Sequence, residues 1–373
     1  MRGIAILAVL LWHLTRLAPT TTARLALVRP AWMGWAGVDL FFVLSGYLIT
    51  GILLDTAGAP GYFRRFYARR VRRIFPLYYG TLAVLLWVVP LFGPTATAMV
   101  QPIIGRQWWY WTYTANVAIS RHGFASPGVA DHFWSLAIEE QFYVVWPLLV
   151  LLLPRRALAW GSWGALALSP AIRLAMGFAG WGRLALYVLT VARLDAFAAG
   201  ALIALAERGT VPRASRALLL IVGGGLLFAI AIATPTEYDN IQHLVMGFFT
   251  HTALAILCGA AIAGVVLYPD GAWSQWLSRR QLLRHMGRYS YAMYVVHVPV
   301  LVFTAGSAFD AWATTSIVGQ LTYWAVGVTV FTLVGAASWY GFEARLLGQV
   351  TRSHSTNAFP ATLPLSESMN TPN

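Results

Sequence analysis

Residues 1–16, MRGIAILAVLLWHLTR, place an arginine at position 2, ten uncharged residues after it, and a histidine at position 13 inside an apolar run. The run begins like a secretory signal peptide. It lacks a small-residue cleavage site, however, and further apolar runs of about twenty residues follow along the chain. The first run is therefore predicted to be a membrane-spanning helix. The sequence as a whole predicts an all-α, polytopic transmembrane bundle.

The composition supports this fold class. Of 373 residues, 58% are hydrophobic and 10% are charged, and the mean hydropathy is +0.64, whereas soluble domains carry about 25% charged residues. The net charge of +13 lies in arginines between apolar segments, as expected for basic inner-face loops, so we expect no nucleic-acid partner. The single cysteine, Cys258, excludes an intramolecular disulfide and any cysteine-based metal site.

Ten apolar segments are candidate spans. They lie near residues 3–19, 35–54, 76–93, 134–153, 157–177, 184–206, 215–233, 244–268, 288–307 and 317–341. A long loop, 94–133, carries clustered tryptophans and tyrosines, which favour the membrane–water interface. We therefore expect a transmembrane domain over residues 1–345 and a disordered polar tail over 346–373.

Arginine counts predict the orientation. With the N-terminus inside, the inner segments hold eighteen arginines and the outer segments seven, and Arg193 lies within a span. The positive-inside rule then places both termini in the cytoplasm. The absence of lysine is typical of a G+C-rich genome and suggests a bacterial cytoplasmic membrane.

Several ionisable residues are predicted at one depth. A helix rises about 1.5 Å per residue, which puts His13 roughly 16 Å beyond Arg2, in the outer half of the bilayer. The same measure places Asp39, the glutamate pair at 139–140 and His297 in that outer layer. Ionisable groups inside a membrane are costly and mark functional sites, so a shared polar cavity is expected there.

Two groups also have a purely structural interpretation. Arg193 and Asp195 would form an ion pair that holds helices together, although residues at i and i+2 point to different faces. The stretch 61–79, GYFRRFYARRVRRIFPLYY, carries six arginines, which either fix the topology through anionic lipids or bind a phosphorylated ligand. Composition alone leaves both interpretations of the stretch open.

Four stretches together resemble acyltransferase family 3, the bacterial inner-membrane acyl-CoA-dependent O-acyltransferases. They are RGIAILAVLLWH (2–13), GWAGVDLFFVLSGYLIT (34–50), ARRVRRIFPLYY (68–79) and HFWSLAIEEQFYVVWPLL (132–149). Weaker similarities follow at 192–204, 289–300 and Glu343. Family members usually carry a short leader before the arginine, whereas here Met1 precedes it directly. The resemblance covers about residues 1–345.

The resemblance implies transfer of an acyl group, most often acetyl, from cytoplasmic acyl-CoA to a hydroxyl of a carbohydrate, such as an exopolysaccharide or another cell-surface glycan. Acyl-CoA is then a co-substrate, and no permanently bound cofactor or metal is expected. The partners are acyl-CoA, a carbohydrate or glycolipid acceptor and the lipid bilayer. Alternative interpretations are acylation of a glycosylated small metabolite and, from another class, a secondary transporter, although no internal repeat is visible. An intramembrane serine protease using Ser45 or Ser135 is a weaker alternative, because Ser45 lacks a Gly-x-Ser-Gly setting.

Each matching position receives an expected role. His13 is the general base, because its pKa is ordinarily near neutrality. Asp39 is expected to orient the ring, with Glu139 as its competitor. An acyl-histidine intermediate is the alternative to direct attack. The residues expected to bind acyl-CoA are Arg2, Arg69, Arg70, Arg72 and Arg73. The residues expected to line the acceptor pocket or support it are His132, Trp134, Ser135, Glu140, Tyr143, Tyr294 and His297, the last two also as oxyanion donors.

Overall fold

The computed structural model describes residues 1–18, 20–213, 222 and 241–346, and over these residues it consists of helices without a β-strand. The longer helices are α1 (Arg2–His13), α2 (Thr22–Trp32), α3 (Gly37–Thr56), α4 (Tyr62–Ala83), α5 (Pro94–Ile104), α8 (Phe133–Leu152), α9 (Arg155–Phe178), α11 (Leu194–Glu207), α13 (Ile241–Val266), α15 (Gln281–Thr304) and α17 (Ile317–Ser338). Shorter helices are α6 (Gln107–Trp111), α7 (Ala115–His122), α10 (Arg183–Val188), α14 (Ala272–Arg279) and α16 (Ala308–Ala313), with single turns η1 (Met33–Ala36), η2 (Val84–Val88), η3 (Val89–Phe92), η4 (Thr190–Arg193) and η5 (Trp339–Glu343).

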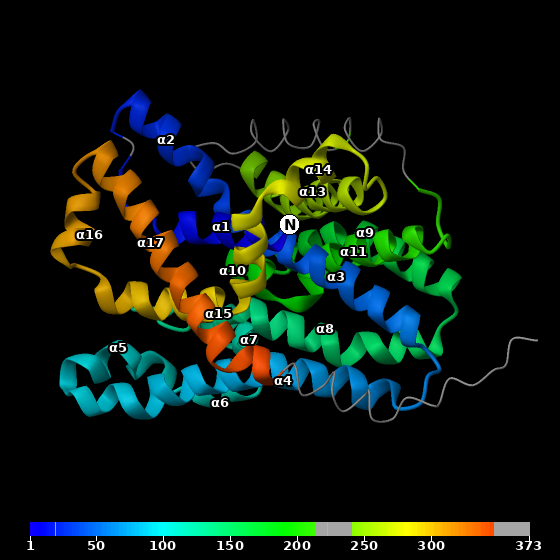
Figure 1. Cartoon of the computed structure of the whole chain (residues 1–373), viewed down its shortest axis with the longest axis horizontal. Coiled ribbons are helices and arrows are strands. Elements are labelled where there is room, and N and C mark those ends of the chain that lie inside the picture. The colour runs from blue at the N-terminus through cyan, green and yellow to red at the C-terminus, as the bar shows by residue number, and fades with distance from the viewer. Residues whose placement is uncertain (19, 214–221, 223–240, 347–373) are drawn as a thin grey trace, which may run out of the picture.

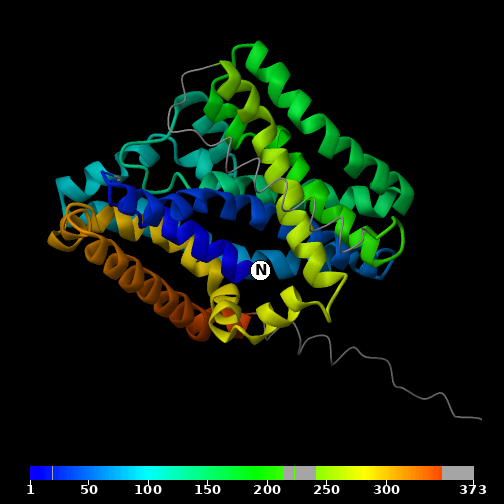
Figure 2. The same cartoon turned by 90° about the horizontal axis from the view of Figure 1, so that it is seen from above.

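The helices pack in a succession that places α1 and α3 at the centre. The order of packing contacts is α17, α15, α1, α3, α11 and α9. Figure 2 shows the orange α17 on one side of the molecule and the green α9 on the other, with the blue α1 and α3 between them. In Figure 1, α8 and α4 run below this layer. The two stretches with the strongest family resemblance therefore form the interior of the bundle.

The predicted helical membrane fold is confirmed in part. Among the described residues, five helical segments are long and apolar enough to cross a membrane: Thr22–Thr56, Tyr62–Phe92, Phe133–Leu152, Phe248–Val266 and Ile317–Leu346. Helix α9 also covers the expected span 157–177, and α15 covers the expected span 288–307 as far as Thr304. The expected span at 215–233 and the tail beyond residue 346 lie outside the described residues, so the count of ten spans and the position of the termini stay predictions.

One expected span is interrupted. Residues 184–206 do not form a single helix, because the chain turns extended at Leu189 and passes through η4 before α11 begins. This break brings Arg193, the last residue of η4, against α3. The break therefore determines where the buried charge of Arg193 lies.

Helix α1 is shorter than the expected span 3–19, and it ends at His13. The chain beyond it is fixed by the side chain of Gln320, whose Nε2 donates to the carbonyl of Leu14 at 3.0 Å. The backbone N–H groups of Arg16 and Leu17 donate to Gln320 Oε1 at 2.7 and 2.8 Å. A buried side-chain amide thus replaces the bonds that further helical turns would have made.

Glycines set the close approach of the central helices. A Cβ at Gly46 of α3 would lie 2.2 Å from the carbonyl oxygen of Phe197, and one at Gly200 of α11 would lie 2.1 Å from that of Val43. These two backbones are in contact without side chains between them, as small residues allow inside membranes. Their close packing buries Asp39, near the start of α3, and Arg193, just before α11.

Candidate active site

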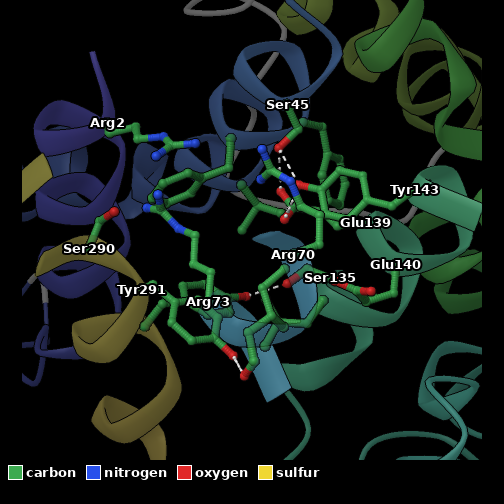
Figure 3. Close-up of a pocket in the computed structure, with 16 residues that line it drawn as sticks. Arg2, Ser45, Arg70, Arg73, Ser135, Glu139, Glu140, Tyr143, Ser290 and Tyr291 are labelled. Atoms are coloured by element: carbon green, nitrogen blue, oxygen red, sulfur yellow. Dashed lines mark hydrogen bonds between the residues drawn. The ribbon is translucent and has the colours of Figure 1, made fainter. Parts of the chain in front are cut away.

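A small cavity of about 70 Å³ lies between α1, α3, α4, α8 and α15, and arginines and glutamates share its wall (Figure 3). Its polar lining residues are Arg2, Ser45, Arg70, Arg73, Ser135, Glu139, Glu140, Tyr143, Ser290, Tyr291 and Tyr294. In Figure 3, Arg2 enters from α1 and the other two arginines enter from α4. We refer to it below as the arginine cavity.

Three of the five arginines expected to bind acyl-CoA face this cavity. Arg70 and Arg73 are three residues apart on α4 and therefore lie on one face of the helix. Arg69 and Arg72 lie on the exposed part of α4 and do not line the cavity. The structure therefore brings Arg2, Arg70 and Arg73 together, and it separates the other two predicted arginines from them.

Glu139 is fixed inside the arginine cavity. Ser45 donates a hydrogen bond to Glu139 Oε1 at 2.9 Å, and Tyr143 donates one to Glu139 Oε2 at 3.1 Å. These bonds are among the dashed lines in Figure 3. Glu140 lines the same cavity, and its Oε1 is buried without a hydrogen-bond partner among the described residues. Because Glu139 is held here by two hydroxyl groups, it does not orient His13.

A larger cavity of about 410 Å³ contains His13. It is lined by Val9, Trp12, His13, Trp35, Val38, Phe124, Gly128, Asp131, His132, Trp134, Tyr187, Tyr294 and Val298. Aromatic rings provide much of this wall, and histidines and Asp131 provide its polar groups. Flat aromatic surfaces with a few polar groups are typical of pockets for small organic ligands. We refer to it below as the histidine cavity.

Three histidine rings lie together here, and two of them, His13 and His132, line this cavity. The ring of His297 lies 4.8 Å from that of His13 and 5.1 Å from that of His132, measured between centroids. Nδ1 of His13 bonds the carbonyl of Val9 at 2.9 Å, and Nδ1 of His297 bonds that of Tyr294 at 2.6 Å. A carbonyl accepts only, so both rings carry their proton on Nδ1 when neutral. Nε2 of His13 is then the basic nitrogen.

The same bonding corrects one expected role. His297 was a candidate oxyanion donor, but its neutral ring has no proton on Nε2, the nitrogen left without a partner among the described residues. His132 is bonded through Nε2 to the carbonyl of Val295 at 3.1 Å, which leaves its Nδ1 unprotonated. The neighbours of His13 are therefore hydrogen-bond acceptors in their neutral forms. Among the described residues, no group of three or more histidine, cysteine, aspartate or glutamate side chains is arranged to hold a metal ion.

The expected pairing of Asp39 with His13 is wrong. Asp39 Oδ1 accepts a bond from Arg193 Nη2 at 2.5 Å, and both side chains are almost completely buried. His251 Nδ1 lies 3.8 Å from the same oxygen. The guanidinium of Arg193 outcompetes a neutral imidazole for a buried carboxylate, because only a full opposite charge compensates the loss of water. His13 is oriented by a backbone carbonyl instead.

Arg193 and Asp195 do not pair with each other, because they face different helices as their spacing indicates. Asp195 accepts a bond from Arg173 Nη2 at 2.9 Å and another from Thr252 at 2.6 Å. The sequence interpretation overlooked Arg173, Thr252 and His251. An ionisable residue inside an apolar run was the signal that identified His13, and it was also present at His251.

The ring of Tyr187 lies between the Asp39–Arg193 pair and the interior of the histidine cavity. The Arg193 guanidinium lies over the Tyr187 ring, 5.5 Å from its centroid. Tyr187 lines the cavity, and its ring is 4.7 Å from that of Trp134. The buried pair thus supports the wall of the cavity and does not touch its interior. Asp39 therefore lies behind the wall of the cavity and is not part of its lining.

The two cavities meet at a shared partition. Val38 and Tyr294 line both of them. The hydroxyl groups of Tyr294 and Ser135 are 2.6 Å apart, and the Tyr294 hydroxyl donates to the carbonyl of His132 at 3.1 Å. Cationic side chains therefore lie on one side of a thin partition, and His13 lies on the other.

Comparisons with known proteins identify the family of this chain. The family model described as an acyltransferase domain matches residues 1–340. This chain belongs to that acyltransferase family. No solved structure matches it.

The curated relatives of this acyltransferase are larger proteins. The peptidoglycan O-acetyltransferase OatA of Listeria monocytogenes is 29% identical over 330 residues, covering 82% of this chain and 49% of the relative. The putative peptidoglycan O-acetyltransferase YrhL of Bacillus subtilis is 27% identical, covering 96% and 56%. The O-acetyltransferase OatA of Staphylococcus aureus is 27% identical, covering 81% and 50%. The chain spans about half the length of the curated relatives it matches.

Proposed function

We propose that this protein transfers an acyl group, most often acetyl, from cytoplasmic acyl-CoA to a hydroxyl of a cell-surface glycan. The observation that carries the proposal is the pair of cavities that meet at Val38 and Tyr294. One has the cations that phosphates bind, and the other has a histidine with a free basic nitrogen and aromatic walls that suit sugar rings. The names of the curated relatives, which act on peptidoglycan, support a glycan acceptor.

The donor enters on the arginine side. Arg2, Arg70 and Arg73 bind the phosphates of CoA, because guanidinium groups form paired, charge-assisted hydrogen bonds with phosphate. The phosphates bind where the three arginines line the cavity, and the narrow pantetheine arm extends from there toward the partition. The thioester then reaches the partition beside Val38 and Tyr294.

The chemistry takes place at His13. Nε2 removes the proton of an acceptor hydroxyl as that oxygen attacks the thioester carbonyl carbon, and the Nδ1–H bond to Val9 holds the ring in the required tautomer. The tetrahedral intermediate collapses, the C–S bond breaks, and the imidazolium returns its proton to the departing thiolate. The products are the O-acyl glycan and free CoA.

The proposed orientation follows from the arginine distribution. Arg2 and the basic start of α4 lie at the cytoplasmic face, and the histidine cavity opens toward the outside, with ten spans and both termini inside. The chain then lies in a bacterial cytoplasmic membrane. Donor and acceptor need not cross the bilayer, because each approaches the shared partition from its own side.

The test measures thiol release from acetyl-CoA and acetyl incorporation into a glycan acceptor by purified protein. His13→Ala is expected to lower transfer by at least two orders of magnitude, the range of general-base catalysis. His122→Ala, an exposed histidine at the end of α7, is the matched control and retains transfer. Full transfer by the His13→Ala protein would refute the assignment of the base.

A further inference from the structure

A third cavity, larger than the arginine cavity and the histidine cavity, is an apolar groove that has no role in the proposed reaction. It has a volume of about 590 Å³ and lies between α15, α16 and α17. Its lining residues are Leu14, Val300, Leu301, Phe303, Thr304, Ala305, Gly306, Ser307, Phe309, Tyr323, Val326, Gly327, Val330 and Phe331. Most of these side chains are hydrocarbon, and Val326 and Val330 are each 42% exposed toward the surroundings of the bundle.

The groove lies next to the three histidines, from which Leu14 and Phe331 separate it. Leu14, which lines the groove, directly follows His13 in the chain. On the opposite helix, the ring of Phe331 also lines the groove and lies 6.3 Å from the ring of His297, measured between centroids. The two side chains are 2% exposed, so they close the groove against the histidines. A chain held in the groove therefore lies next to the end of α1 that carries His13.

The guanidinium group of Arg16 contacts both a residue of the groove and the backbone of His13. The Arg16 guanidinium carbon lies 5.8 Å from the ring centroid of Tyr323, a groove residue, and Arg16 Nη1 donates to the carbonyl of His13 at 2.8 Å. Arg16 Nε also donates to Asp310 at 2.7 Å, and the Arg16 side chain remains 27% exposed. One guanidinium thus stands where a chain leaving the groove turns toward His13.

We propose that the groove holds the hydrocarbon chain of a phosphate-bearing lipid to which the acceptor saccharide is still attached. The chain lies along α15 and α17, the phosphate binds Arg16, and the saccharide enters the histidine cavity. The inference rests on the proposed function and specifies its acceptor as a lipid-linked glycan. An ordinary membrane lipid has the same hydrocarbon and phosphate chemistry, and the experiment separates the two.

The first experiment compares acceptors in the intact chain, reconstituted in nanodiscs of phosphatidylethanolamine and phosphatidylglycerol. Acetyl-CoA is the donor, and the acceptors are one saccharide on a polyprenyl phosphate and the same saccharide free. Wild type is expected to acetylate the lipid-linked form with at least a tenfold higher kcat/KM. Val330→Trp fills the groove and raises KM for that acceptor at least fivefold. Leu333→Trp, an exposed α17 position outside the groove, leaves it unchanged.

The outcomes distinguish the two proposals. Equal use of both acceptors, or an equal loss with both in Val330→Trp, overturns the lipid-linked acceptor while transfer itself persists. This is also the result if the groove holds only bulk phospholipid. Absence of thiol release and of acetylation with every acceptor overturns the proposed function, and the inference falls with it.

The second experiment tests the phosphate contact. Arg16→Gln is expected to raise KM for the lipid-linked acceptor at least fivefold with little change for the free saccharide. Asp310→Asn removes the same ion pair but keeps the guanidinium, so KM is expected to stay the same or fall. An equal rise of KM in both variants would mean that the ion pair only holds the local structure, and it would overturn the phosphate role.

Discussion

The buried Asp39–Arg193 pair can be tested for two roles. If it only supports the cavity wall, loss of Asp39 lowers both stability and acceptor binding. If the carboxylate takes part in the chemistry, transfer is lost while stability is kept. The pair joins Arg193 Nη2 and Asp39 Oδ1 at 2.5 Å, and the two side chains are 0% and 1% exposed. Asp39→Asn leaves the Arg193 guanidinium buried without its counter-charge. Loss of one partner from such a pair costs about 3–5 kcal/mol of stability.

A cost of about 4 kcal/mol lowers the folded-to-unfolded ratio roughly a thousandfold. The double variant Asp39→Leu, Arg193→Met removes both charges and keeps apolar contact with Phe42 and Tyr187, so it is expected to recover most of that stability. SDS-titrated unfolding of the purified protein gives the free energies. In parallel, thiol release and KM for the acceptor report the function of each variant.

A positioning role predicts a particular pattern. Asp39→Asn is destabilised and raises the acceptor KM, because Tyr187 loses its support, while the double variant regains both properties. The reasoning is refuted if Asp39→Asn unfolds like wild type and yet loses transfer. In that case the carboxylate takes part in the chemistry itself.

The other predictions concern the donor site, one loop and the helix packing. Arg73→Ala is expected to weaken acetyl-CoA binding at least tenfold, measured by titration, whereas Arg72→Ala, on the exposed part of α4, is expected to bind normally. Burial raises the pKa of Asp131 to about 6 from an unfolded value of 3.8, so the folded protein takes up a proton first. Thermal stability should therefore rise as the pH falls from 7.5 toward 4.5, and Asp131→Asn should flatten this slope. Gly200→Ala places a Cβ 2.1 Å from a backbone oxygen and should cost at least about 1–3 kcal/mol in unfolding experiments. Gly161→Ala meets no atom within 4 Å and should be neutral or slightly stabilising.

The contrast between Arg72 and Arg73 shows what the sequence pattern predicted and what it left undetermined. The run 68–79 identified a basic stretch near the inner face, and in the structure it lies within α4. Which arginines enter a cavity depends on how α4 is rotated against α1 and α8, and the run of arginines does not encode that rotation by itself. The three-residue spacing grouped Arg70 with Arg73 only once one of them was known to face inward.

The carboxylates show the same limit. Depth along a helix placed Asp39 and Glu139 in the layer of His13, because rise per residue is a local property. The partner of Asp39, Arg193, lies 154 residues away in the chain, and Ser45, one of the two partners of Glu139, lies 94 residues away. The break at η4 that delivers Arg193 to Asp39 left no mark in the hydropathy pattern.

The sequence by itself determined the helical membrane fold, the family and the set of ionisable residues, because hydrophobic length and local motifs depend on neighbours in the chain. Only the tertiary structure decided that the arginines and His13 occupy two cavities with one partition, that a backbone carbonyl orients His13, and that an apolar groove adjoins it. Those features arise where helices distant in sequence pack together. In a low-dielectric interior, the buried carboxylate of Asp39 is stabilised by a full opposite charge, and the packing of the helices determines that this charge is Arg193.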